Sequence, residues 1–208
     1  MTSWLVKSVF LILLLTVGVA PAGARTKILV MGDSISAAYG IQRDAGWVAL
    51  LEERLGELEQ PWQVINASIS GETTGGGLAR LPNVLEIHDP AVVIIELGGN
   101  DGLRGYPVPK IRDNLDQLVA LAAAGDRDVL LLGIQIPPNY GPRYTSAFAA
   151  MYHEIADRYG VALVPFLLEK VALTPTLMQN DGIHPTAEAQ PQLLDTVWPA
   201  LTGLLAAP

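Results

Sequence analysis

Short apolar runs alternate with helical segments along most of the chain, and this alternation constrains the fold more than any other feature. Runs typical of buried strands lie at residues 28–31, 63–67, 91–97, 129–136 and 161–165. Segments with helical spacing of apolar residues lie at residues 46–58, 74–88, 108–124, 144–159 and 186–205. Such alternation favours parallel strands joined by right-handed crossovers. The sequence therefore predicts an α/β fold of three layers, α/β/α, around a doubly wound parallel sheet.

Chemically active residue types gather where the predicted strands end. Ser34 follows the first strand, Gly71 the second and Asn100 the third, while Asp181 and His184 precede the last helix. In doubly wound sheets, ligands bind beyond the carboxyl ends of the strands. We therefore expect these loops to converge. Together they supply a hydroxyl, backbone donors, an amide and an Asp/His pair, which acyl transfer to a serine requires.

Each of these residues has a defined role in that chemistry. Ser34 Oγ can attack a carbonyl once a base takes its proton, and the imidazole of His184 titrates in the right range. Asp181 can turn back, accept the other ring N–H and so fix the tautomer. The backbone N–H groups of Ser34 and Gly71 and the amide of Asn100 can surround the oxyanion.

Taken singly, each residue also has an ordinary structural explanation. Ser34 fits a helix N-cap, Gly71 fits a turn, and Asn100 fits an Asx turn. Asp181 begins a turn-forming Asp-Gly dipeptide, and His184 precedes a proline that fits a helix start. Only the combination, in this order on this fold, favours catalysis.

Two further aspartates, Asp33 and Asp101, are expected to hold their loops by hydrogen bonds. The alternative, in which Asp33 is the acid of the triad, stays open because triad acids are recognised by geometry. The histidines are widely separated along the chain, and no spacing resembles a zinc motif.

The composition and net charge restrict the classes of protein to which this chain can belong. The chain has 208 residues, of which 50% are hydrophobic, and this fits one globular domain. A formal net charge of −8 argues against nucleic acid as a partner. The sequence contains no cysteine, which excludes disulfides, thiolate metal sites and a cysteine nucleophile.

The N-terminal segment has the three parts of a secretory signal. Lys7 precedes an apolar run at residues 9–20, and small residues follow up to a cleavage site after Ala24. The run is shorter than the roughly 20 residues that span a bilayer. We therefore expect residues 1–24 to be removed, no stable membrane anchor, and a single exported domain at residues 25–208, periplasmic or secreted.

Four sequence blocks carry a family resemblance: GDSISAAYG, NASISGETT, ELGGNDGLRG and DGIHP. In this order they resemble the signature blocks of the SGNH hydrolases, also called GDSL-type esterases. Within that family the chain is most similar to the exported bacterial acyl-CoA thioesterases, lysophospholipases and arylesterases, and the similarity extends over nearly the whole mature chain.

The resemblance implies a triad of Ser34, Asp181 and His184, and an oxyanion hole of Ser34, Gly71 and Asn100. It also implies a flavodoxin-like sheet of five parallel strands and no metal or cofactor. The implied activity is hydrolysis of thioesters and esters of fatty acids. We expect the reaction to pass through an acyl-serine, on a small-molecule substrate, in a monomeric enzyme.

The resemblance further implies that the loop at residues 102–107 flanks the acyl chain. Leu103 and Tyr106 offer apolar contact there, and Gly102 offers mobility. Tyr140, after the fourth predicted strand, can form another wall. The alternative is a plain glycine-rich surface loop.

One departure from the family pattern is the run of three glycines at residues 75–77, where relatives tend to carry polar side chains. It weakens the predicted helix start and leaves the chain-length preference open. Two other functions fit the same fold: carbohydrate O-deacetylation, and non-catalytic capture of a lipid or sugar. A flavodoxin-like FMN carrier is excluded if the purified protein is colourless.

Overall fold

The computed structural model describes residues 27–58 and 62–206, and its centre is a five-stranded parallel sheet. The strands are β1 (Lys27–Gly32), β2 (Gln63–Asn66), β3 (Val92–Glu96), β4 (Asp128–Leu132) and β5 (Ala162–Val164). Their order in the sheet, β2-β1-β3-β4-β5, is the flavodoxin-like order. The predicted fold class is confirmed.

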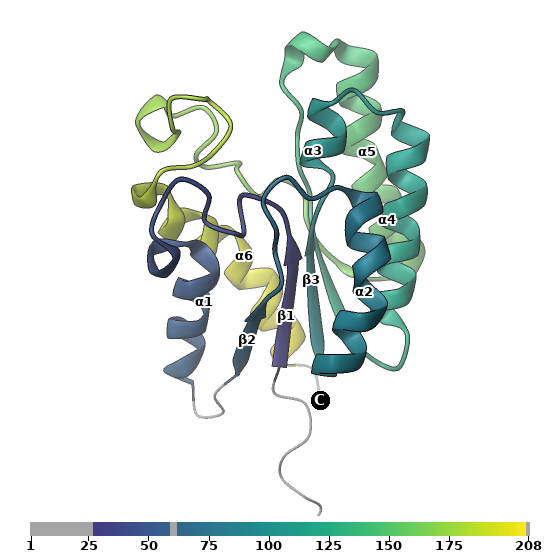
Figure 1. Ribbon diagram of the computed structural model, residues 1–208, viewed down its shortest axis with the longest axis vertical. Helices are drawn as coiled ribbons and strands as arrows, with labels where there is room; N and C mark the ends of the chain where they lie inside the picture. Colours follow the sequence, from purple (N-terminus) through teal and green to yellow (C-terminus); the bar gives the residue numbers. More distant parts are fainter. Residues whose placement is uncertain (1–26, 59–61, 207–208) are drawn as a thin grey trace, which may run out of the picture.

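Helices cover both faces of the sheet (Figure 1). One face carries α1 (Trp47–Gly56) and α6 (Gln190–Leu205), and the other carries α2 (Thr74–His88), α4 (Val108–Ala123) and α5 (Pro142–Tyr159). The side chains of β1 divide between the two cores: Ile28 and Val30 face α1 and α6, while Leu29 and Met31 face the other layer. Because both faces are buried, the strand is apolar at successive positions rather than at alternate ones.

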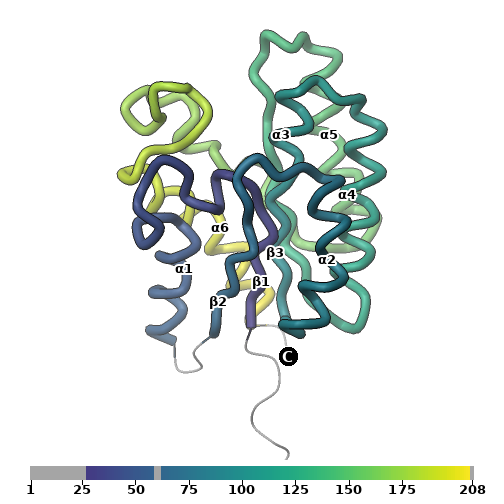
Figure 2. Tube along the Cα trace, in the orientation of Figure 1, coloured from purple at the N-terminus to yellow at the C-terminus, as the bar shows by residue number. Residues whose placement is uncertain are grey.

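Long loops and short helical segments gather at the carboxyl edge of the sheet. They include α3 (Gly99–Leu103) and the 3₁₀ turns η1 (Arg43–Ala45), η2 (Pro138–Tyr140), η3 (Pro175–Leu177) and η4 (Ala187–Ala189). The trace in Figure 2 shows the loops after β1, β2 and β3 and the long segment before α6 at this one edge. The fold therefore brings the candidate site loops to the same end of the molecule.

The fourth strand is shorter than its apolar run predicts, because β4 ends at Leu132 and not at residue 136. The chain leaves the sheet at Gly133, whose N–H donates to Val164 O (2.7 Å) and whose carbonyl accepts from Leu167 N (3.0 Å). A Cβ at Gly133 would lie 2.1 Å from Pro165 O, so only glycine permits this approach. The apolar residues that follow, Ile134 and Ile136, are buried in the core on the face of the sheet that α2, α4 and α5 cover.

Other boundaries also differ from the prediction. The last helix begins at Gln190 rather than residue 186, after the turn η4, and residues 99–103 form the helix α3 instead of a loop. Helix α2 continues through Pro82, held by buried leucines on its inner face. The predicted signal peptide lies outside the described residues. None of the helices in residues 27–58 and 62–206 is long and apolar enough to cross a membrane.

Candidate active site

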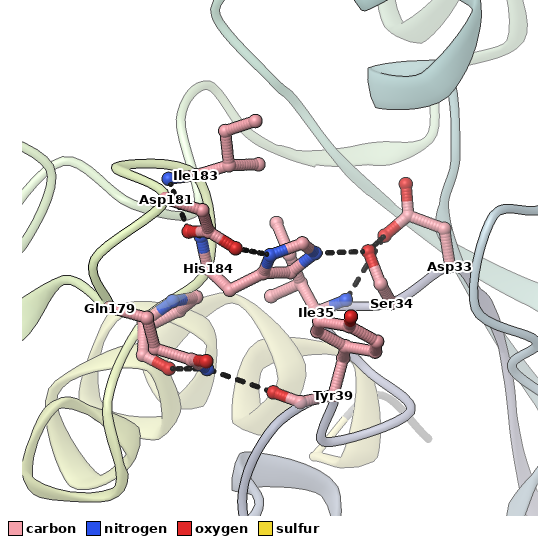
Figure 3. Close-up of polar contacts among 9 residues, drawn as sticks. Asp33, Ser34, Ile35, Tyr39, Gln179, Asp181, Ile183 and His184 are labelled. Carbon is pink, nitrogen blue, oxygen red and sulfur yellow. Dashed lines mark hydrogen bonds and ion pairs between the residues drawn. The ribbon is translucent and has the colours of Figure 1, made fainter.

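Ser34, His184 and Asp181 form one continuous chain of hydrogen bonds (Figure 3). Ser34 lies two residues after the end of β1, and its Oγ lies 2.9 Å from His184 Nε2. His184 Nδ1 lies 2.6 Å from Asp181 Oδ2. A nucleophile, a base and a carboxylate that orients the base are therefore in hydrogen-bonding contact, as the chemistry of an activated serine requires.

The environment of Asp181 keeps this carboxylate ionised. Its Oδ1 accepts the backbone N–H of Ile183 (2.9 Å) and of His184 (3.0 Å). Partial burial acts to raise the pKa of Asp181, but hydrogen bonds from the His184 ring and from these two N–H groups lower it to about 2. An ionised Asp181 accepts the Nδ1 proton of His184, which leaves Nε2 free to accept the proton of Ser34.

A glutamine that the sequence reasoning missed joins the histidine loop to the serine loop. Gln179 Nε2 donates to Tyr39 O (2.8 Å) and to Pro185 O (3.0 Å), and Gln179 N donates to His184 O (2.7 Å). The ring of Tyr39 lies 4.6 Å from the His184 ring, centroid to centroid. These contacts hold His184 opposite Ser34, and they join segments about 140 residues apart that no local pattern connects.

The loop that contains Gly71 is held against the end of β1. Ile69 N donates to Gly32 O (3.1 Å), and Arg104 Nη2 donates to Gly71 O (3.3 Å). Gly71 has φ +81°, in the left-handed region that glycine adopts without strain. Neither Ser34 N nor Gly71 N donates a hydrogen bond to any residue of the described ranges. Both N–H groups are thus free to donate to a ligand.

Asn100 lies at the start of α3, and Asp33 holds its amide. Asn100 Nδ2 donates to Asp33 Oδ2 (3.1 Å), while Asp33 Oδ1 accepts Ile35 N (3.1 Å). Burial raises the pKa of Asp33 to about 6. The Asp33 side chain lies on the side of Ser34 away from His184 (Figure 3), so it does not contact the histidine. The structure therefore gives no support to Asp33 as the acid of the triad.

Asp101 holds its loop, as predicted. Its Oδ2 accepts Thr74 N (2.9 Å) and its Oδ1 accepts Thr74 Oγ1 (2.7 Å). Asn114 Nδ2 donates to the same hydroxyl at 3.0 Å. All three side chains are buried. This network joins the start of α2 to α3, and so joins the loop of Gly71 to the helix of Asn100.

Gly102 lies in a helix and not in the mobile loop that the sequence predicted. It is buried within α3, and a Cβ there would lie 2.4 Å from Ile136 Cδ1 and 2.8 Å from Phe148 Cε2. The glycine therefore permits close packing of α3 on its neighbours. Contact of Gly102 with a substrate stays a prediction.

The remaining predicted substrate-binding residues lie at the end of α3 (Leu103), in the segment that follows it (Tyr106) and in η2 (Tyr140). Leu103 is half-buried and its carbonyl accepts Tyr140 Oη at 2.7 Å. Tyr106 is 43% exposed and its carbonyl accepts Tyr144 Oη at 2.7 Å. Two tyrosine hydroxyls therefore fix the backbone of this segment. Contact of Leu103, Tyr106 and Tyr140 with a substrate stays a prediction.

Within residues 27–58 and 62–206, no cluster of three or more His, Asp or Glu side chains is arranged to hold a metal ion.

Comparison with known proteins identifies the family. The model of the GDSL-like Lipase/Acylhydrolase family matches residues 30–190. The chain belongs to this family. The resemblance read from the four sequence blocks is confirmed, and this GDSL-family chain is a hydrolase.

The similarity to known proteins extends over most of the chain. Esterase TesA of Pseudomonas aeruginosa is 54% identical over 184 residues, 88% of this chain and 91% of that protein. Thioesterase 1/protease 1/lysophospholipase L1 of Escherichia coli K12 is 43% identical over 196 residues, 92% of this chain and 89% of that protein. A crystal structure of the psychrotrophic esterase EstA from a Pseudoalteromonas species, inhibited by monoethylphosphonate, has a TM-score of 0.83 and 43% identity, covering 88% of this chain and 100% of that one.

Proposed function

We propose that this GDSL-family hydrolase cleaves carboxylic esters and thioesters of fatty acids through an acyl-Ser34 intermediate. The observation that carries the proposal is the hydrogen-bonded chain from Ser34 Oγ through His184 to Asp181, at 2.9 Å and 2.6 Å. Such a chain activates a serine hydroxyl near neutral pH, where the hydroxyl alone is a weak nucleophile.

The reaction proceeds in two acyl transfers. In the first, His184 Nε2 takes the proton of Ser34 as Oγ attacks the substrate carbonyl. The oxyanion accepts hydrogen bonds from Ser34 N, Gly71 N and Asn100 Nδ2. Collapse of the tetrahedral intermediate expels an alcohol or thiol, which receives the proton from His184. In the second, His184 takes a proton from water, the hydroxide oxygen attacks the acyl carbonyl, and the fatty acid leaves as the proton returns to Ser34.

The substrate class rests on the relatives and on the side chains of Leu103, Tyr106 and Tyr140. The relatives carry the names esterase, thioesterase and lysophospholipase. Leu103, Tyr106 and Tyr140 offer apolar surface beside the site, and the two tyrosine-to-backbone hydrogen bonds reduce the ordering that a bound acyl chain would require. We place the acyl chain against these three side chains.

The competing functions differ in their response to acyl length. A carbohydrate O-acetylesterase should favour acetyl esters and reject octanoyl or longer chains, and a binding protein should hydrolyse none. Rates on matched p-nitrophenyl esters and acyl-CoA thioesters from acetyl to palmitoyl separate the three. We expect rates that rise beyond acetyl on both series, with Ser34→Ala at least about 10³-fold slower. Activity confined to acetyl esters, or unchanged in Ser34→Ala, would contradict the proposal.

We further propose that the protein is exported after removal of residues 1–24 and acts as a monomer. The basic, apolar and small-residue parts of that segment support export. The mass of the processed protein in a cell fractionation, together with light scattering of the purified enzyme, tests both points. A retained N-terminus would contradict cleavage, and a dimer mass would contradict the monomer.

A further inference from the structure

A buried glutamate lies beneath the nucleophile loop and takes no part in the mechanism described above. Glu96 is the last residue of β3, is fully buried, and pairs in register with Gly32 of β1. A Cβ at Gly32 would lie 2.8 Å from Glu96 Oε2. The glycine before Asp33 therefore makes room for a carboxyl group at the turn from β1 into the loop.

The contacts of this carboxyl group flank Ser34 on both sides. Glu96 Oε2 accepts Asp33 N at 3.2 Å and Ser36 Oγ at 2.8 Å. Asp33 precedes Ser34, and its own carboxylate holds the amide of Asn100 at 3.1 Å. One buried oxygen thus holds the Asp33 backbone on one side of the nucleophile and the Ser36 hydroxyl on the other, and through Asp33 it bears on the orientation of an oxyanion donor.

The second oxygen of Glu96 indicates the charge state. Glu96 Oε1 is buried and has no hydrogen-bond partner among the residues of the described ranges. A buried carboxylate with one oxygen unpaired is costly in free energy. Burial, and then the nearby Asp33, raise the pKa of Glu96 well above its usual range. Two adjacent buried carboxyl groups cannot both ionise cheaply, so the neutral form of Glu96 leaves the negative charge to Asp33.

We propose that Glu96 is a positioning residue, a neutral carboxyl group that holds Asp33 and Ser36 and so aligns Ser34 Oγ with the Asn100 amide. The inference rests on the proposed role of Ser34 as the nucleophile. Glu96 contacts no reacting atom. Its effect reaches the reaction through Asp33 and Ser36, and it acts on the chemical step rather than on substrate binding.

Three variants separate positioning from charge and from packing. Glu96→Gln keeps a neutral group with an acceptor oxygen, Glu96→Leu removes the acceptor at similar volume, and Ser36→Ala removes one of the two contacts. Leu55→Ala is the control for lost stability, because Leu55 is fully buried near the end of α1, away from the site. Readouts are kcat, KM, the rate of phosphonylation of Ser34 by a fluorophosphonate, and the thermal midpoint.

We expect Glu96→Leu to lower kcat and the phosphonylation rate together by about 10²-fold, the scale of a small misplacement at a reacting atom, with KM within about two-fold. Ser36→Ala should lower kcat by about five-fold, the effect of losing one ordinary hydrogen bond, and Glu96→Gln should lower kcat by less than that. Leu55→Ala should lower the thermal midpoint without this loss of kcat. If Glu96→Leu does not fold, the comparison of kcat between Ser36→Ala and Glu96→Gln decides the question.

The inference is overturned if Glu96→Leu and Ser36→Ala match Leu55→Ala in kcat. It is equally overturned if Glu96→Gln falls as far as Glu96→Leu, since that result requires an ionised group. Labelling of wild-type Ser34 distinguishes these failures from failure of the proposed function. If the wild-type serine is not labelled, the mechanism itself is wrong, whatever the Glu96 variants show.

Discussion

Asn100→Ala removes the single side-chain donor assigned to the oxyanion. Asn100 Nδ2 carries two N–H groups, and one is committed to Asp33 Oδ2 at 3.1 Å. The other is available to the developing oxyanion. Removal of one such donor costs about 10²–10³ in kcat, or about 2.7–4 kcal/mol of transition-state stabilisation. Because the charge develops mainly in the transition state, KM should change by no more than a few-fold.

The same change also lowers stability, so a matched control is needed. Asp33 is 3% exposed, and the loss of a hydrogen bond to this carboxyl should cost about 1.5–3 kcal/mol of folding free energy. Leu55→Ala is the control, since it removes a fully buried side chain near the end of α1, away from the oxyanion. Its kcat should stay within about three-fold of wild type, because the change costs about 2–5 kcal/mol of folding free energy without touching the site.

The assay is steady-state hydrolysis of a p-nitrophenyl ester, well below the lowest thermal midpoint of the set, with urea unfolding of each variant. If Asn100→Ala keeps kcat within ten-fold of wild type, or if Leu55→Ala loses as much, the assignment of Asn100 to the oxyanion is refuted.

Three other perturbations have defined outcomes. Asp181→Asn should lower kcat by about 10²–10⁴-fold with little change in KM, measured in the same ester assay, because the histidine loses its orienting charge. Asp33→Asn should gain stability relative to wild type as pH rises from about 4 to about 6, by up to about 3 kcal/mol in urea unfolding. Burial raises the folded pKa of Asp33 to about 6, so the stability of the wild-type protein is complete below the unfolded pKa and is lost as pH rises through 6. Gly75→Ala should stabilise α2 by about 0.5–1 kcal/mol, since its Cβ would meet nothing closer than 3.5 Å. Gly76→Ala should stabilise the helix less than Gly75→Ala does, or destabilise it, because its Cβ would lie 1.9 Å from Glu72 Oε1. Thermal unfolding of the two variants makes this comparison.

The site could be predicted from sequence where topology alone fixes position. Parallel strands end at one edge of a sheet, so Ser34, Gly71 and Asn100 had to lie near that edge once the strands were recognised. Asp181 and His184 are close in sequence, and a tight turn accounts for their contact. These placements need only the order of elements and local turn chemistry.

What the sequence did not reveal depends on distant partners. In the sequence alone, Gly102 suggests a mobile loop. The structure shows instead that a side chain at this position would collide with Ile136 and Phe148. The apolar run after β4 suggests a longer strand, and only the approach of Gly133 to the carbonyl of Pro165 ends it. Each of these depends on a close approach between segments that no periodicity encodes.

The sequence itself marks Glu96 as an unusual residue. It is the one charged residue within the apolar run AVVIIEL, at the end of the most hydrophobic strand. A charge in such a position is rarely buried without a partner. The partners, Asp33 N and Ser36 Oγ, lie about 60 residues away, so the sequence could flag the residue but not what it holds.

The most direct test of the catalytic assignment is the mapping of a fluorophosphonate adduct on the mature protein by mass spectrometry. We expect one adduct, on Ser34, that forms at least about 10³-fold more slowly in His184→Ala, because the imidazole that takes the proton of Ser34 is then absent. An adduct on another residue, or labelling of Ser34 at the same rate without the histidine, would contradict a serine nucleophile activated by His184.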